Sequence, residues 1–169
     1  YKRQQLRSFP VSDSVKRITF FEGNLFVSCK YTILKIDNKG DITKFYRSPF
    51  VYFHDIVATK CGLILWTEDY CLYVGKPPGK VVAMTIKGDN AWKYGNSSLK
   101  SPHGLDVDSF DHIYVADRDN NSVHVLSNAG ALIRIIENIP KPLFFKLNEA
   151  RGTVCVCSDE NEMIIYKFK

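Results

Sequence analysis

Residues 102–136 read PHGLDVDSFDHIYVADRDNNSVHVLSNAGALIRII, and their short apolar segments are separated by turns rich in Asp, Asn and Gly. The segment HIYVA consists mainly of β-branched and aromatic residues and has turn-forming residues on both sides, which is typical of a β-strand. The stretch therefore predicts consecutive antiparallel strands joined by tight turns.

The same order of strands and turns occurs four times along the chain. The second strand of each repeat is the most apolar, and these strands align at Leu25, Leu63, Ile113 and Val154, in steps of 38, 50 and 41 residues. They are almost continuously apolar, whereas a strand with one face in water alternates. Both faces are therefore expected to be buried, as in the four-stranded blades of a β-propeller.

We therefore expect one all-β propeller segment over residues 1–169, built from antiparallel blades. The repeats are predicted at about 15–47, 51–88, 101–137 and 140–169. In the second repeat, the third strand is predicted at 71–77 and the fourth at 81–87, and the turn-rich segment of about 76–100 is predicted to be an insertion. Residues 1–9 resemble an outer strand, which either closes the last repeat or belongs to a preceding blade.

The third repeat resembles the NHL repeat. The residues that match its pattern are Pro102, Gly104, Val107, Asp108, Ile113 to Asp117, Asn120, Val123, Val125 and Gly130. Because NHL propellers usually have six blades, the resemblance implies that four repeats are part of a larger ring. It also implies structural roles for Pro102, Gly104, Asp108, Asp117, Asn120 and Gly130.

NHL propellers similar to this one commonly form the C-terminal, target-recognising module of tripartite-motif ubiquitin ligases. The resemblance thus implies a non-catalytic recognition module for a protein partner, with RING and B-box modules upstream in a parent chain. Residues 63–69, LILWTED, also resemble the YWTD blade of extracellular receptor propellers, but the other three repeats lack that string.

The apolar residues expected in loops are candidates for contact with a protein partner. Large side chains that have no role in a strand are available to bind another surface. These candidates are Tyr52, Phe53, Tyr70, Trp92, Tyr94 and Phe110.

The net charge of +5 belongs to the N-terminal quarter, where residues 1–47 hold ten Lys and Arg against four Asp and Glu. Basic residues beside aromatic ones can bind phosphates and stack on unpaired bases. RNA binding is therefore the alternative function, and its candidate residues are Lys30, Tyr31, Lys44, Tyr46 and Arg47.

Two histidines, His54 and His103, occupy equivalent positions in the first strands of the second and third repeats. Propeller enzymes of the amidating-lyase and lactonase families hold a metal at that level of the channel, so a metal-dependent enzyme is the second alternative. A catalytic metal needs about three protein ligands, and the other two repeats offer Lys16 and Leu143. We therefore expect polar lining of the channel mouth, with no metal, no cofactor and no small-molecule substrate.

The five cysteines match neither a zinc-ribbon spacing nor a small disulfide framework, so reduced thiols and a cytoplasmic location are expected. Asp117, Asp119, Asn120 and Asn121 crowd one turn, where Asp and Asn side chains stabilise backbone turns. No apolar run approaches the roughly 18 residues that would span a membrane.

Overall fold

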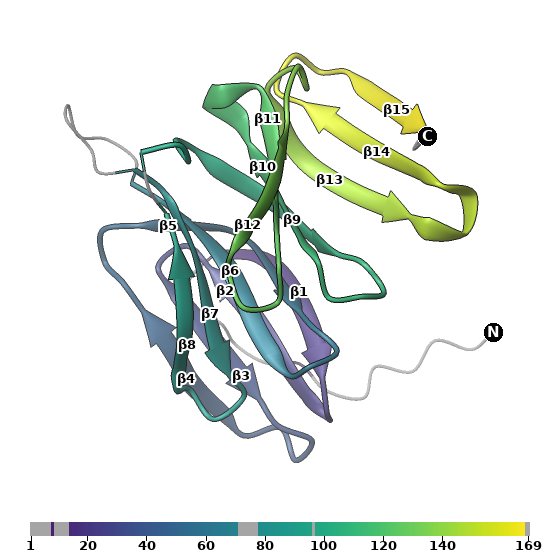
Figure 1. The fold of residues 1–169 in the computed structure, drawn as a ribbon. Coiled ribbons are helices and arrows are strands. Elements are labelled where there is room, and N and C mark those ends of the chain that lie inside the picture. Colours follow the sequence, from purple (N-terminus) through teal and green to yellow (C-terminus); the bar gives the residue numbers. More distant parts are fainter. Residues whose placement is uncertain (1–7, 9–13, 71–77, 96, 168–169) are drawn as a thin grey trace.

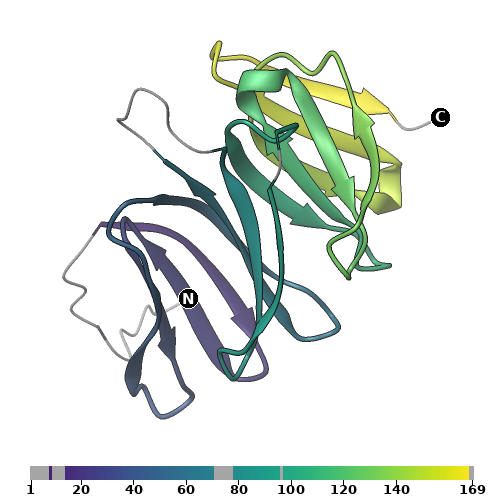
Figure 2. The same cartoon turned by 60° about the vertical axis from the view of Figure 1, so that its left-hand side comes forward.

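The computed structural model describes residue 8 and residues 14–70, 78–95 and 97–167. This part of the chain folds into four antiparallel sheets, here called blades 1 to 4 (Figure 1). The sheets follow one another in chain order and pack side by side (Figure 2). The prediction of an all-β propeller is confirmed.

The strands of each blade follow in sequence order from the innermost to the outermost. Blade 1 contains β1 (Val15–Phe21), β2 (Asn24–Cys29), β3 (Thr32–Ile36) and β4 (Ile42–Arg47). Blade 2 contains β5 (Tyr52–Ala58), β6 (Leu63–Asp69), β7 (Lys80–Thr85) and β8 (Asn90–Tyr94). Blade 3 contains β9 (Pro102–Val107), β10 (Ile113–Asp117), β11 (Ser122–Leu126) and β12 (Leu132–Ile136). The described strands of blade 4 are β13 (Pro142–Asn148), β14 (Thr153–Ser158) and β15 (Met163–Lys167).

The helical content of the described residues is limited to two short 3-10 turns. They are η1 (Arg118–Asn120), which follows β10, and η2 (Glu149–Arg151), which follows β13. Among the residues that the structure describes, no helix has the length and apolarity needed to cross a membrane.

The hydrophobic core lies between the blades. One cluster joins Phe26 of blade 1 to Trp66 of blade 2, and a second joins Leu65 of blade 2 to Leu105 of blade 3. Trp66 and its neighbour Leu65 therefore point to opposite faces of β6, and both are fully buried. Full burial of one aliphatic side chain such as Leu65 stabilises the fold by about 1.5–3 kcal/mol. Packing on both faces thus explains the nearly continuous apolar strands β6 and β10, as predicted, whereas β14 of blade 4 is fully buried only at alternate residues.

Blade 2 departs from the predicted strand order. The segment predicted as a fourth strand forms β7, which pairs directly with β6 through Trp66 and Val82 and is therefore the third strand. The fourth strand is β8, which lies inside the segment that was predicted to be an insertion. The tight turn between β7 and β8 has Gly88 at φ +94°, a conformation that glycine adopts without steric cost.

The segment predicted as the third strand, residues 71–77, lies outside the described residues. The same holds for most of the outer strand predicted at residues 1–9. The outer strand therefore stays a prediction, whereas the position of the third strand in blade 2 belongs to β7 and not to residues 71–77.

Candidate functional site

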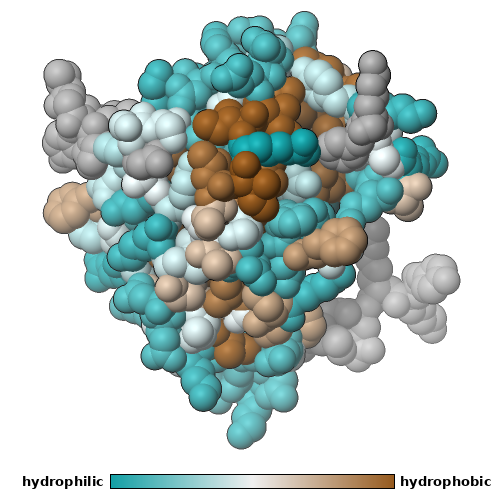
Figure 3. Space-filling model, viewed as in Figure 1, coloured by the Kyte–Doolittle hydropathy of each residue, from teal (hydrophilic) through white to brown (hydrophobic). Residues whose placement is uncertain are grey.

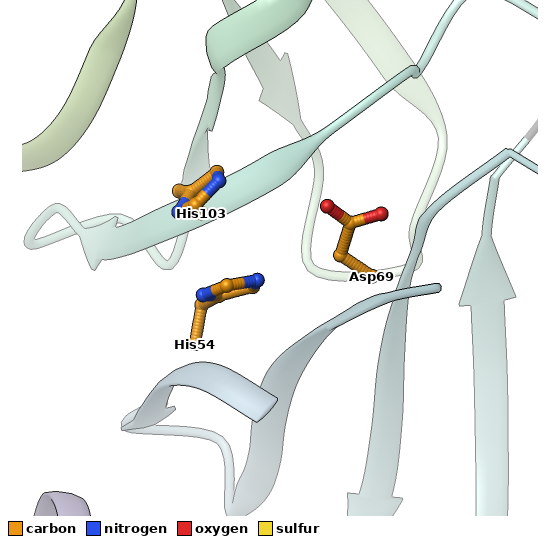
Figure 4. A group of neighbouring side chains, drawn as sticks. All are labelled: His54, Asp69 and His103. Carbon is orange, nitrogen blue, oxygen red and sulfur yellow. The ribbon is translucent and has the colours of Figure 1, made fainter. Parts of the chain in front are cut away.

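The first strands place His54 and His103 against each other. β5 and β9 are neighbouring strands. His54 lies two residues before Ile56, which pairs with Trp66 of the second strand. His103 lies in the same way two residues before Leu105, which pairs with Val115. The ring centroids of the two histidines are 3.9 Å apart at an interplanar angle of 36° (Figure 4). The two histidines that occupy equivalent positions in the sequence repeats are thus in direct contact between blades 2 and 3.

The carboxylate of Asp69 completes this group from the end of β6. Donor atoms of His54, Asp69 and His103 all lie within 4.8 Å of one another. Asp69 is buried, and its Oδ2 accepts a hydrogen bond of 2.9 Å from Ser101 Oγ. We call these three residues the His–Asp–His cluster.

The electrostatic surroundings favour a neutral His103 imidazole. Burial lowers the pKa of His103, and the positive charge of Arg118 lowers it further, whereas Asp69 acts in the opposite direction. Arg118 is itself paired, because it donates to Asp159 from Nε at 2.8 Å and to Asp119 from an Nη at 2.9 Å. Neutral imidazole nitrogens are available as metal ligands.

A pocket of about 460 Å³ lies beside the cluster and shares His54 with it. We call it the basic pocket, and it is lined by Lys16, Arg17, Lys30, Tyr52, Phe53, His54 and Phe144. Three cations therefore meet at one opening whose other walls are largely aromatic. Lys30 had been assigned to RNA and Tyr52 to protein contact, so the structure unites residues from two separate predictions.

Two cations of the basic pocket, Lys30 and Arg17, lie over aromatic rings. Lys30 Nζ lies 4.9 Å from the ring centroid of Tyr31 and 5.2 Å from that of Tyr52. The two tyrosine rings stack at 5.5 Å. Hydrogen bonding to Tyr31 is the largest cause of the raised pKa of Lys30. The guanidinium of Arg17 lies 4.3 Å from the ring centroid of Phe144, which joins blade 1 to blade 4.

The remaining RNA candidates lie on β4 and do not form one stacking surface. Lys44 and Arg47 are exposed, but the ring of Tyr46 packs at 4.8 Å on Trp66. Burial, together with the nearby carboxylate of Glu68, raises the pKa of Tyr46 to about 12. Tyr46 therefore belongs to the packing between blades 1 and 2.

Two of the predicted protein contacts are corrected by their burial. Phe53 is 1% exposed and Tyr94 is 7% exposed, so both are core residues on strands. Trp92 is half-buried on β8 and donates from Nε1 to the carbonyl of Asn128 at 2.9 Å. Tyr70 is also half-buried, with Lys80 Nζ 5.4 Å from its ring centroid.

Phe110 is the predicted contact residue that stays fully accessible. Its side chain is 78% exposed in the turn between β9 and β10. Asp108 shapes this turn, because its Oδ1 accepts hydrogen bonds from the backbone N–H groups of Phe110 and His112 at 2.9 and 2.8 Å.

The turns at this end of the molecule are linked from blade to blade. The carboxylate of Asp111 accepts hydrogen bonds from the backbone N–H groups of Lys60 and Cys61 at 2.8 and 2.9 Å. Ser109 Oγ donates to the carboxylate of Glu149 at 2.6 Å. Turns of blades 2, 3 and 4 are thus joined directly.

The repeat positions of blade 3 act through packing and hydrogen bonds. Oδ1 of Asp117 accepts from the backbone N–H of Ser101 at 2.8 Å, and its Oδ2 accepts from the side chain of Asn120 at 2.7 Å. Pro102 is buried, and Gly130 adopts φ +79° in the turn before β12. Gly104 lies so close to β13 that an added Cβ would be 2.7 Å from the carbonyl oxygen of Leu143.

Apolar side chains also gather on the outer strand of blade 3. Leu132, Ile133 and Ile135 of β12 are 43%, 50% and 38% exposed. Figure 3 shows this apolar surface over β12, with polar side chains around it.

The comparison with known families identifies residues 99–126 as an NHL repeat. The match covers one repeat of the β-propeller that the four sheets form. No curated protein matches the chain in sequence.

Several solved structures share the fold at low sequence identity. Streptogramin B lyase superimposes with a TM-score of 0.69 at 16% identity, over 95% of this chain and 57% of that chain. The computationally designed Ika4 protein gives 0.73 at 11% identity, over 99% of this chain and 100% of that chain. A chain of a nidogen/laminin complex gives 0.68 at 15% identity, over 92% of this chain and 64% of that chain.

These likenesses establish the propeller fold alone. The chain spans between 55% and 64% of the length of streptogramin B lyase, a Bacteroides caccae protein and virginiamycin B lyase from Staphylococcus aureus.

Proposed function

We propose that this propeller is a recognition module whose basic pocket binds an acidic segment of a protein partner. The observation that carries the proposal is the convergence of Lys16, Arg17 and Lys30 on one pocket with aromatic walls. Carboxylates are attracted to such a group of cations, and the rings of Tyr52 and Phe144 can cover the apolar stems of Asp and Glu side chains.

The geometry favours a protein partner over RNA. Tyr31 and Tyr52 stack on each other and are in contact with Lys30, so fewer ring faces remain for bases. Tyr46 is engaged by Trp66. The exposed aliphatic side chains of β12 offer a second surface that suits a protein, either by apolar contact or by strand addition at the sheet edge.

We further propose that, in a longer parent chain, this module selects substrates for a ubiquitin ligase of the tripartite-motif type acting in the cytoplasm. The support is the NHL match of residues 99–126 and the resemblance of the third repeat. A partner-binding propeller supplies loops that vary without disturbing the strands, which suits substrate selection.

Fluorescence anisotropy with a labelled peptide rich in Glu and Asp tests the pocket. We expect the charge-reversing pair Arg17→Glu and Lys30→Glu to weaken peptide binding at least tenfold, since both cations line the pocket. Lys93→Glu is the matched control, because Lys93 is exposed on β8 and does not line the pocket.

Single-stranded poly(U) in the same assay separates the two partner classes. Tight RNA binding that falls steeply with salt and is lost in the double variant, without peptide binding, would replace the protein proposal with the RNA alternative. Equal peptide affinity of the double variant and wild type would reject the pocket.

A further inference from the structure

We propose that His54, Asp69 and His103 form a binding site for one divalent transition-metal ion, with Zn²⁺ as the representative, that bridges blades 2 and 3. The donor set is two imidazole nitrogens and one carboxylate oxygen, all within 4.8 Å of one another. The inference goes beyond partner recognition and does not depend on it.

The spacing of the donor atoms is close to what the ion requires. Zinc binds imidazole nitrogen and carboxylate oxygen at about 2.0–2.2 Å, so tetrahedral ligands lie about 3.3 Å apart. The donors of the His–Asp–His cluster lie within 4.8 Å, and rotation of the three side chains about their χ angles covers the remaining distance.

The three side chains also have suitable orientations. In Figure 4, one nitrogen of each imidazole ring lies on the side that faces the Asp69 carboxylate. The backbone explains this arrangement, because β5 and β9 both have an irregular register beside their histidines, between Phe53 and Ile56 in one case and opposite Val115 to Asp117 in the other. Such bulges redirect side chains within a sheet.

The neighbours of the cluster support a bound cation. Ser101 Oγ donates to Asp69 Oδ2 and thereby orients the carboxylate, as residues around metal ligands commonly do. Arg118 is the nearby positive group, and its pairing with Asp119 and Asp159 offsets its repulsion of a metal ion.

The donor types select the class of ion. Imidazole nitrogen suits Zn²⁺ and related transition metals, whereas Ca²⁺ and Mg²⁺ prefer sites made of oxygen. Three protein ligands leave a coordination position for water or for a ligand anion. Because His54 also lines the basic pocket, an anion there would lie near the ion.

Isothermal titration of the whole 169-residue chain with ZnCl₂ tests the proposal, with Co²⁺ absorption as a second readout. We expect one ion per chain and a melting temperature that rises with zinc. His54→Phe, His103→Phe and Asp69→Asn should each weaken zinc binding about tenfold or more, since loss of residues that merely support ligands already costs 10–100-fold. The Phe variants keep an aromatic ring and its stacking while removing the donor nitrogens.

The control variants separate this site from other metal-binding groups. His112→Phe, which alters a histidine in the turn between β9 and β10, should bind zinc as the wild type does. Cys155→Ser with Cys157→Ser should also leave zinc binding unchanged, although these two thiols interact with each other on β14. Each variant is first checked for a cooperative melting transition, and if one ligand variant does not fold, the other two decide.

Three results would overturn the proposed zinc site. Absence of a stoichiometric zinc heat in the wild type, or zinc affinity unchanged in the three ligand variants, would overturn the site. A thiolate-to-Co²⁺ charge-transfer band would also overturn it, because that band would place the metal on cysteine. None of these outcomes affects peptide binding by the basic pocket, so the two proposals fail separately.

Discussion

The hydroxyl of Tyr94, on the outermost strand of blade 2, lies 2.8 Å from Nδ1 of His124 in the third strand of blade 3. Both side chains are buried. His124 Nε2 in turn lies 3.4 Å from Asp117 Oδ2, so a chain of polar groups extends from one blade into the next. Blade 1 places Tyr46 at the equivalent position, next to Glu68 of blade 2.

We predict that Tyr94→Phe lowers the free energy of unfolding by about 1–2 kcal/mol, because it leaves the buried His124 nitrogen without its partner. Urea unfolding measures the change. Tyr166→Phe is the control, since the described residues include no hydrogen-bond partner for the Tyr166 hydroxyl, and it should change stability by less than about 0.5 kcal/mol. Equal effects of the two variants would show that the Tyr94 contact contributes nothing specific.

Gly104→Ala should destabilise the contact between blades 3 and 4 by about 1–3 kcal/mol, as overpacking of a close contact does. The new Cβ would lie 2.7 Å from the Leu143 carbonyl oxygen and 2.9 Å from Cα of Phe144, which are backbone atoms that cannot rotate away. Gly152→Asn is the control, because Gly152 has open space around it and a φ of +59° that Asn tolerates. A melting temperature unchanged by Gly104→Ala would contradict the close packing.

The pH dependence of stability should contain a contribution from Asp117. Burial by itself raises the pKa of this carboxyl, but the neighbouring His124 and hydrogen bonds from Ser101, Lys100 and Asn120 outweigh it, and the pKa lies below its ordinary value of 3.8. Near that pH the unfolded state therefore binds more protons than the folded state. The stabilisation is fully present above pH of about 4 and is lost as the pH falls through the folded-state pKa.

Asp117→Asn isolates this contribution. We expect the variant to be about 2–3 kcal/mol less stable than wild type at neutral pH, as for other broken buried networks. The difference should be smaller in urea titrations at the acid end of the folded range. If the stability difference between wild type and variant stays constant or grows toward acid pH, the pKa of Asp117 is not lowered in the folded protein.

Phe110→Ser should leave the stability within about 0.5 kcal/mol of wild type, because the side chain is exposed and contributes little burial. If the turn contributes to partner binding, the same variant should weaken capture of a partner that the wild type binds. A drop of several degrees in melting temperature would instead show that Phe110 packs in the folded protein.

The blades could be predicted because their signal is local. Alternation of apolar strands with Asp, Asn and Gly turns defines each strand, and all four first strands begin within two residues of the start of their predicted repeat. In blade 2 the segment between β6 and β7 is long, and one strand was wrongly predicted inside it. The strand β8 and its buried Tyr94 were therefore missed. Phe53 was expected in a loop, but it lies on β5 and is buried in the core.

The candidate site was only partly predictable. Equivalent positions in two repeats identified His54 and His103, since a repeat fold places equivalent residues in adjacent blades. Glu68 is the buried acidic residue that matches Asp117 in blade 3. Asp69 is a second acidic residue directly after it, and this extra carboxylate was the sequence signal that could have identified Asp69. Its approach to His103 depends on how blade 3 packs against blade 2, which no local spacing encodes.

The hydrogen bonds that Asp111 and Ser109 make across three blades have a consequence for how such a protein can acquire new specificity. Turns joined in this way must change together, because an exchange in one blade removes a partner from the next. The opposite end, where the first strands begin, carries links of the same kind, from Ser101 to Asp69 and from Arg118 to Asp159, so new loops grafted there also have to keep the residues that join the blades.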